Sequence, residues 1–144
     1  SNFVEKDTLC VRPSSESVDW GGPGAVLNIG MNDERCSHLS KYIGKKAAAE
    51  LYFRFIQVYS VNVARLDPDV FDHMTDANGN SVSAALTAYQ DEMNENFPQS
   101  IEHQLSEVLR SMARAWEGTS ARLLREAKGA PADAGLGLVI QKMA

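Results

Sequence analysis

Apolar side chains recur every three to four residues through most of the chain, which is the spacing of an amphipathic helix. The clearest case is 45–66, where Leu51, Phe55, Val58 and Tyr59 follow this spacing. The same pattern recurs at intervals almost to residue 128. Helices are predicted over 33–43, 45–66, 68–73, 81–97 and 101–116, with a last short helix that ends near 128.

Capping residues and helix breakers mark the ends of these predicted helices. Asn32 and Asp33 can cap the first helix, and Gly44 ends it. Asp67 precedes Pro68, which ends the long helix and begins a short one, because the residue before a proline disfavours helical backbone. Phe97-Pro98-Gln99 and Gly118-Thr119-Ser120 separate the later helices.

The two ends of the chain have strand-like sequences instead. Residues 8–11 and 136–143 are apolar and β-prone, and a turn-rich connector (129–135) precedes the second of them. The predicted fold class is therefore helix-dominated α+β, in a single domain over 1–144. Strands this close to both ends need neighbours to pair with, which suggests a piece of a larger protein. Ser1-Asn2 resembles a tag remnant and is left out of this interpretation.

Composition narrows the possible functions. The chain has 144 residues and a formal net charge of −5, which argues against a general nucleic-acid or membrane surface. No apolar run is long enough to span a bilayer, and no signal peptide is apparent. Cys10 and Cys36 lack a metal-type spacing, as do His38, His73 and His103, so we expect no metal site in this chain. Together these features predict a cytoplasmic protein.

Residues 7–33 contain the residue types that most strongly suggest a binding site. A strand-like segment ends at Arg12, and Gly21, Gly22 and Gly24 follow in a loop. Glycines let backbone N–H groups approach anionic oxygens closely, and an arginine supplies a charged planar fork. A phosphate-binding loop is one interpretation. The alternative is an ordinary glycine-rich turn, with Arg12 paired to Glu16 or Asp19.

Other polar side chains are less specific. Arg54 lies among aromatic and aliphatic residues, where a guanidinium needs an anion unless it faces solvent. The anion would be a ligand phosphate or a structural carboxylate. Gln141 and Met143 lie on the last strand, whose backbone could meet an adenine edge or could simply be buried. The late helices carry arginines that we interpret as a solvated charged face, at positions 110, 114, 122 and 125.

Several segments resemble pyruvate, phosphate dikinase. Residues 11–12, the glycine loop and 26–33 (VLNIGMND) resemble the VRSG start, the methionine- and glycine-rich loop and the LNLGLN exit of that family. Residues 52–59 (YFRFIQVY) resemble its YRRFIQMY. The remaining matches are FPQ at 97–99 with QL at 104–105, Trp116 with Arg125, and 138–143, which resembles the strand VNVQTMV.

This resemblance implies part of an N-terminal ATP-grasp nucleotide-binding domain. In the family, that domain passes phosphoryl from ATP to a swivelling phosphohistidine domain, and a barrel domain then makes phosphoenolpyruvate. Arg12 and Arg54 would contact the nucleotide phosphates, and Gly21 would lie in the loop over the transferring phosphate. Gln141 and Met143 would lie beside the adenine. The implied cofactors of the full-length protein are ATP and Mg²⁺, and a homodimer is the implied assembly.

The chain also departs from the family pattern. Asp19-Trp20-Gly21-Gly22-Pro23-Gly24 replaces Met-Pro-Gly-Met-Met-Asp, Glu16 replaces the second arginine of VRSGAR, and Phe53 replaces the first arginine of YRRF. The family's catalytic lysine lies upstream and its magnesium carboxylates lie downstream of this segment. We therefore expect the isolated chain neither to hydrolyse ATP nor to bind it tightly. Alternatives are a phosphoenolpyruvate synthase-like domain, a degenerate regulatory module and a helical interaction domain.

Overall fold

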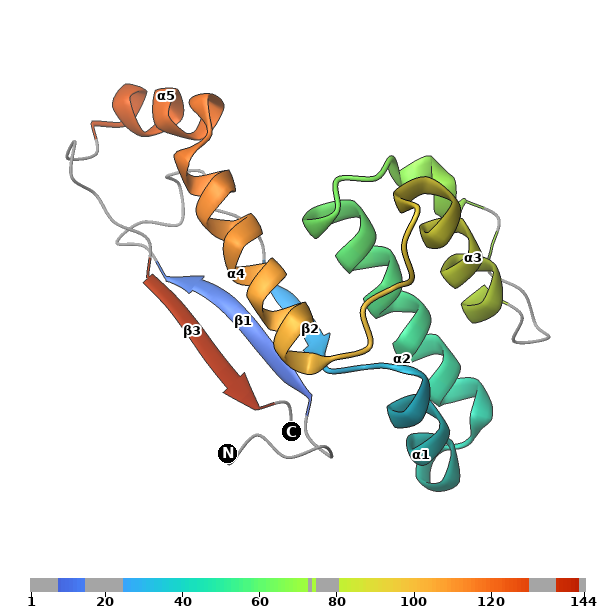
Figure 1. Ribbon diagram of the computed structural model, residues 1–144. Helices are drawn as coiled ribbons and strands as arrows, with labels where there is room; N and C mark the ends of the chain where they lie inside the picture. The colour runs from blue at the N-terminus through green and yellow to red at the C-terminus, as the bar shows by residue number, and fades with distance from the viewer. Residues whose placement is uncertain (1–7, 15–24, 73, 75–80, 130–136, 143–144) are drawn as a thin grey trace.

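A computed structural model describes residues 8–14, 25–72, 74, 81–129 and 137–142. These residues form a small sheet flanked by helices (Figure 1). The strands are β1 (Leu9–Ser14), β2 (Val26–Ile29) and β3 (Gly137–Lys142), and the α-helices are α1 (Asp33–Ile43), α2 (Lys45–Val58), α3 (Ser81–Met93), α4 (Ile101–Glu117) and α5 (Thr119–Ala127). The helix-dominated α+β class predicted from the sequence is confirmed.

The sheet joins the two ends of the described chain. Its strand order is β2-β1-β3, and both pairings are antiparallel. The first and last strands therefore pair with each other. The sequence pattern predicted both of them but missed β2, because its four residues include a half-exposed Leu27 and show no alternation. The register between β1 and β2 also shifts between Leu9 and Val11, a bulge that periodicity alone does not reveal.

Most helix boundaries follow the predicted caps. The side chain of Asn32 accepts a hydrogen bond from the backbone N–H of Arg35 at 2.7 Å, and Gly44 (φ 91°) ends α1. Asp67 caps a short 3-10 helix, Pro68–Phe71. These local signals act through backbone groups that a helix end leaves unpaired, so they could be recognised without knowledge of the fold.

Two helices end earlier than predicted. The helix starting at Lys45 leaves α geometry after Val58 and continues as a π-helix over Tyr59–Val63, with Arg65 at φ 66° beyond it. α3 was expected to reach residue 97 but ends at Met93, where Asn94 takes a left-handed conformation (φ 57°). Asparagine tolerates this conformation, so Asn94 acts as a C-terminal stop.

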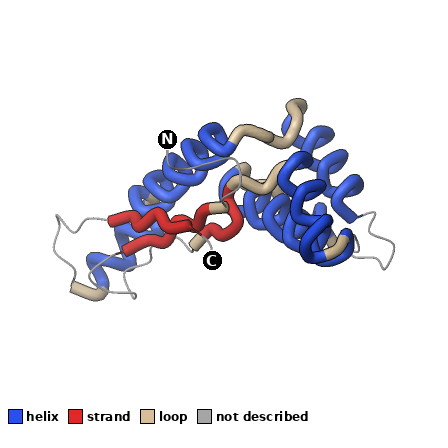
Figure 2. The backbone as a smooth tube through the Cα atoms, turned by 90° about the horizontal axis from the view of Figure 1, so that it is seen from below, coloured by secondary structure: helices blue, strands red, loops and turns tan. Residues whose placement is uncertain are grey.

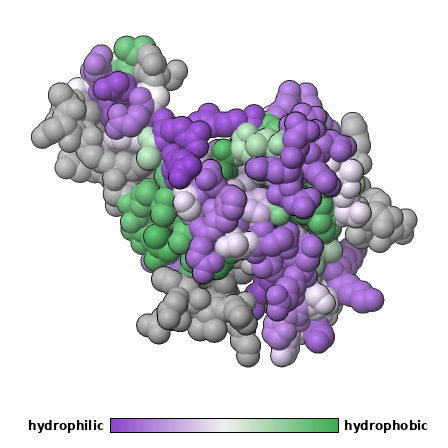
Figure 3. Space-filling view, viewed as in Figure 1, coloured by the Kyte–Doolittle hydropathy of each residue, from purple (hydrophilic) through white to green (hydrophobic). Residues whose placement is uncertain are grey.

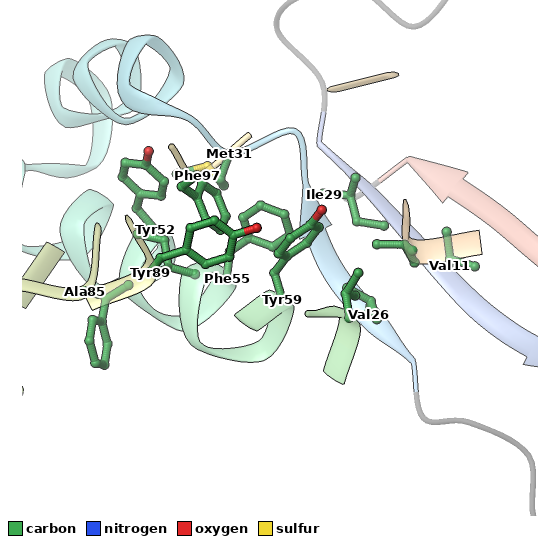
Figure 4. Close-up of a cluster of buried hydrophobic side chains, with 14 of the residues drawn as sticks. Val11, Val26, Ile29, Met31, Tyr52, Phe55, Tyr59, Ala85, Tyr89 and Phe97 are labelled. Carbon is green, nitrogen blue, oxygen red and sulfur yellow. The ribbon is translucent and has the colours of Figure 1, made fainter. Parts of the chain in front are cut away.

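An aromatic cluster forms the core between the helices. Phe97 lies at its centre and packs edge-on against Tyr52, Phe55, Tyr59 and Tyr89, with ring centroids 5.2 to 6.4 Å apart. Figure 4 shows these rings beside the apolar side chains that the sheet contributes, such as Val11 and Val26. Phe97 was expected only to break a helix, yet it anchors the helical layer.

Helix α4 connects the sheet to the helical layer. It packs on β1 and β2, while α2 packs on β2 and on α1 and α3. Figure 2 shows the strands along one side of the molecule, with α4 running along the sheet. Val108 and Met112 of α4 are buried in the same core as Leu9 and Val11. One face of the sheet is thus turned toward the helices.

Candidate functional site

Arg12 lies on the face of the sheet turned away from α4. Leu9 and Val11 point into the core, so Arg12, one residue further along β1, projects from the other face and is exposed. In the register between β1 and β3, Arg12 is opposite Val139, and Cys10 is opposite Gln141. Residues directly opposite each other share a face. Arg12 and Gln141 are therefore diagonal neighbours on one face of the sheet, which we call the outer face; both are exposed, whereas Cys10 on the same face is buried.

Arg12 has no carboxylate partner among the described residues; Arg110, in contrast, pairs with Glu107 at 3.4 Å. The guanidinium is therefore open to solvent or to an added anion. The predicted alternatives, pairing with Glu16 or Asp19, lie outside the described residues. The outer face combines this charge with the exposed amide of Gln141 and a half-exposed Val139.

Arg54 lies on a different element. It is on the solvent side of α2, between the buried rings of Phe53 and Phe55, and shares an exposed stripe with Lys46 and Glu50. A helix turns each residue by about 100° relative to the last, so an exposed arginine can sit between two buried aromatics. The apolar sequence around Arg54 therefore did not imply a buried charge. The pairing of β1 with β3 places Arg12 near Gln141. Arg54 is on α2 and takes no part in that pairing.

Several predicted positions cannot be placed. Gly21, Gly22 and Gly24 of the predicted phosphate loop, and Met143 at the end of the last strand, lie outside the described residues. So does His73. Of the other two histidines, His103 is exposed and His38 is half-buried beside Tyr42, with the ring centroids 5.2 Å apart.

Gln104 is fully buried and joins three segments, a role that sequence reasoning missed. Its Oε1 accepts a hydrogen bond from the Gly30 N–H at 2.7 Å. Its Nε2 donates to the Met31 carbonyl at 3.0 Å and to the Pro98 carbonyl at 2.7 Å. The side chain thus satisfies backbone groups that would otherwise be buried without partners. The only signal in the sequence was the shared QL segment, which did not reveal this role.

A second set of polar contacts surrounds Gln99. Its Oε1 accepts from the Asp33 N–H at 2.9 Å, its Nε2 donates to the Tyr52 hydroxyl at 3.2 Å, and its carbonyl accepts from Asn32 Nδ2 at 2.8 Å. The Tyr52 hydroxyl in turn donates to Asp33 Oδ1 at 2.6 Å. Burial, followed by this bond to Asp33, raises the pKa of Tyr52 well above its usual value. We call Asn32, Asp33, Tyr52, Gln99 and Gln104 the polar lock.

The prediction that Arg125 is solvated is wrong. This residue was assigned to a solvated charged face with three other arginines, but its side chain is only 9% exposed. The guanidinium carbon lies 3.8 Å from the ring centroid of Trp116, and Nη2 donates to the Trp116 carbonyl at 2.8 Å. This carbonyl is near the C-terminus of α4, where the helix dipole favours a cation. Arg125 therefore fastens α5 to α4, while the arginines at positions 110, 114 and 122 are exposed as predicted.

The described residues contain no group of three or more His, Cys, Asp or Glu side chains placed to hold a metal ion. In the same residues, no helix has both the length and the apolar character needed to cross a bilayer. Cys10 is buried and Cys36 is half-buried, and both are free thiols. Burial raises the pKa of Cys36, and the charge of Asp33 adds to that effect.

The chain matches known proteins over nearly its whole length. Pyruvate, phosphate dikinase of Clostridium symbiosum is 29% identical over 154 residues, which cover 94% of this chain and 18% of that protein. The same enzyme of Rhizobium meliloti (strain 1021) is 28% identical over 153 residues, covering 94% of this chain and 17% of the relative. That of Giardia intestinalis is 27% identical over 155 residues, with the same two coverages. No protein-family profile matches.

The chain thus spans less than a fifth of the length of these relatives. Their names agree with the resemblance inferred from the ordered motifs, which is confirmed. Over nearly its whole length, this chain is similar to a segment of pyruvate, phosphate dikinase.

Proposed function

We propose that this chain forms part of the ATP-binding domain of a pyruvate, phosphate dikinase-like phosphotransferase. In this proposal it positions the phosphates of ATP for transfer to a histidine on another domain. The rest of an ATP-grasp domain, a phosphohistidine domain and a pyruvate/phosphoenolpyruvate barrel are the expected partners. The isolated chain is expected to be inactive, because phosphoryl transfer needs metal ions and several positive groups fixed around one phosphate.

The observation that carries the proposal is the position of Arg12. A solvent-exposed arginine without a carboxylate partner in the described residues keeps its fork of donors available for phosphate oxygens. The register between β1 and β3 puts Gln141, the predicted adenine-side residue, diagonally beside it. Such diagonal neighbours lie roughly 7–8 Å apart, a span that one nucleotide can cover.

The described residues of the outer face suit ATP better than Mg²⁺. Arg12 and the amide of Gln141 suit an anionic, hydrogen-bonding ligand such as ATP. For Mg²⁺, carboxylate ligands are missing from the described side chains that β1 and β3 place on the outer face, which are a thiol, a guanidinium, an amide and an aliphatic group. In this proposal the magnesium ligands come from parts of the longer enzyme outside this chain. Mg²⁺ would supply charge neutralisation on the phosphates.

A titration of the chain with ATP, followed by amide chemical shifts in NMR spectra, tests this assignment. We expect weak binding, with shifts concentrated on β1 and β3. Replacing Arg12 with alanine should weaken binding at least about tenfold, because a charge-assisted hydrogen bond is lost. Arg114→Ala is the matched control, since Arg114 is also exposed but lies on α4. Equal effects of the two variants would argue against the proposal, and micromolar affinity would contradict the expected weak binding.

The alternatives differ in the chemistry of the complete enzyme. A dikinase-like protein should form AMP from ATP over many turnovers only when both pyruvate and inorganic phosphate are present. A phosphoenolpyruvate synthase-like protein should need pyruvate but not phosphate, and a degenerate regulatory module should form no AMP. The departures at Glu16, Trp20 and Phe53 are the sequence features that favour the degenerate module.

A further inference from the structure

The buried guanidinium of Arg125 has one group without a hydrogen-bond partner. The guanidinium stacks on Trp116, and its Nη2 donates to the Trp116 carbonyl. Its Nη1 is buried and has no acceptor among the described residues. Arginine keeps its charge in proteins, and a buried donor without an acceptor lowers stability. An anionic oxygen bound to Nη1 would therefore be stabilising.

Two further cations lie on the same side of α5. Arg122 and Lys128 are three residues before and after Arg125, a spacing that makes them neighbours on a helix surface, and both are exposed. Within the described part of the chain, none of the three cations has a carboxylate at ion-pair distance. We call Arg122, Arg125 and Lys128 the cationic stripe. Its charges repel one another, and a bound anion would relieve this repulsion.

Helix α5 is held to the rest of the molecule mainly through α4. None of its described side chains belongs to the hydrophobic core, and Leu123 and Leu124 are 60% and 39% exposed. Figure 3 shows mostly hydrophilic surface over α5, at the upper left. The contacts of Arg125 with Trp116 are thus a main attachment of this helix, and a small shift of α5 on α4 would open Nη1 to a ligand.

We propose that the cationic stripe binds a phosphate group, with Arg125 as the central ligand. A phosphate group has close to two negative charges and three strong acceptor oxygens, so it suits three cations better than a carboxylate with its single charge. Inorganic phosphate and a phosphate group on a larger ligand offer the same chemistry. This inference does not depend on the proposed nucleotide role, because Arg12 lies on the sheet face turned away from α4.

The fluorescence of Trp116 gives a direct measurement, since the guanidinium carbon of Arg125 lies 3.8 Å from its ring centroid. The chain has two tryptophans, so Trp20→Phe leaves Trp116 as the only one. In that background, we expect inorganic phosphate to change the emission saturably, with half of the change at roughly millimolar concentration. Sodium acetate and sodium chloride at equal ionic strength should not do so. An equal response to either control salt would overturn the proposal.

A parallel titration with ATP identifies the source of the phosphate group. Arg12→Ala is added to the Trp20→Phe background, so that the outer face contributes little to ATP binding. A response to inorganic phosphate assigns the site to free phosphate, and a response to ATP alone assigns it to a phosphate group carried by a nucleotide. No response to either ligand would overturn the proposal, even if ATP bound to the outer face of the original chain.

Variants of the stripe assign the binding to single side chains, measured by isothermal titration calorimetry because this method does not depend on Trp116. Arg125→Gln should weaken binding at least about tenfold, since both the charge and the fork of donors are lost. Arg122→Ala should weaken it by about threefold, and this exposed residue can be replaced without disturbing the attachment of α5.

Arg110→Ala is the matched control for both variants. Arg110 is also exposed, but it lies on α4 and already pairs with Glu107, so its loss should leave binding unchanged. Thermal unfolding of each variant checks that it folds. Binding that is unchanged in Arg125→Gln or in Arg122→Ala would overturn the proposal.

Discussion

The polar lock and the outer face of the sheet hold their polar side chains in opposite environments, one buried and one exposed. In the lock, Gln104 is fully buried, and both ends of its amide group are hydrogen-bonded. On the outer face, Arg12 is exposed and has no partner in the described residues. A buried amide with every bond satisfied specifies structure, whereas an exposed charge without a partner is available to a ligand.

This difference bears on which parts of the molecule are similar to the dikinases. The segments that resemble the family most closely, around residues 28–33, 52–59 and 97–105, supply the polar lock and the aromatic core. The segments that depart most, around the glycine loop, lie next to the outer face in sequence. The resemblance is therefore strongest where side chains hold the fold together. The phosphate binding that we propose involves the part of the chain where the resemblance is weaker.

The largest expected effect is on Gln104. Replacing it with leucine would leave the Gly30 N–H and the carbonyls of Met31 and Pro98 buried without partners. We expect the free energy of unfolding to fall by about 3 kcal/mol or more, measured by urea denaturation. Gln90→Leu, at an exposed position of α3, should change it by less than about 0.5 kcal/mol. If the two variants were equally stable, Gln104 would not be the central residue of the lock.

A smaller effect is expected for Tyr52→Phe. The variant keeps the buried ring but removes the hydroxyl that donates to Asp33 and accepts from Gln99. The free energy of unfolding should fall by about 1–2 kcal/mol, because Asp33 retains its other bonding options in solvent. Tyr42→Phe, at a 74% exposed position, is the matched control and should have almost no effect. A loss as large as that of Gln104→Leu would mean that the ring packing had also changed.

The smallest effect on stability is expected for Arg12→Ala. An exposed side chain without an ion pair contributes little to folding, so the free energy of unfolding should change by less than about 0.5 kcal/mol. The same substitution is the one expected to weaken ATP binding, which would separate function from stability on the outer face. A loss above 1 kcal/mol, roughly, would show that Arg12 has a structural partner and would weaken the comparison with the lock.

Local signals in the sequence predicted most of the helices. Asn32, Gly44, Asp67 and Gly118 mark helix ends through their own backbone and side-chain chemistry, and the structure has boundaries at each of them. The ends of α2 and α3 were predicted too late, because the π-helix and the left-handed Asn94 depend on how these helices pack. The short strand β2 had no periodic pattern and was missed.

The candidate site was predicted only in part. Its residue types and their order could be recognised, and Arg12 was singled out before any geometry was known. The proximity of Arg12 and Gln141 depends on the antiparallel register of two strands that are separated by more than a hundred residues. Periodicity says which residues share a face of one strand, but not which strand lies beside it.

By itself, the sequence determined the helix-dominated class, the main helix boundaries and the similarity to pyruvate, phosphate dikinase, since all three are written in local patterns. Only the tertiary structure decided that Gln104 and Arg125 are buried, that Arg54 is exposed, and that β3 closes one edge of the sheet beside β1. The physical reason is that burial and strand pairing depend on neighbours distant in sequence. A polar residue shows which bonds it can make, but only the fold supplies the partners.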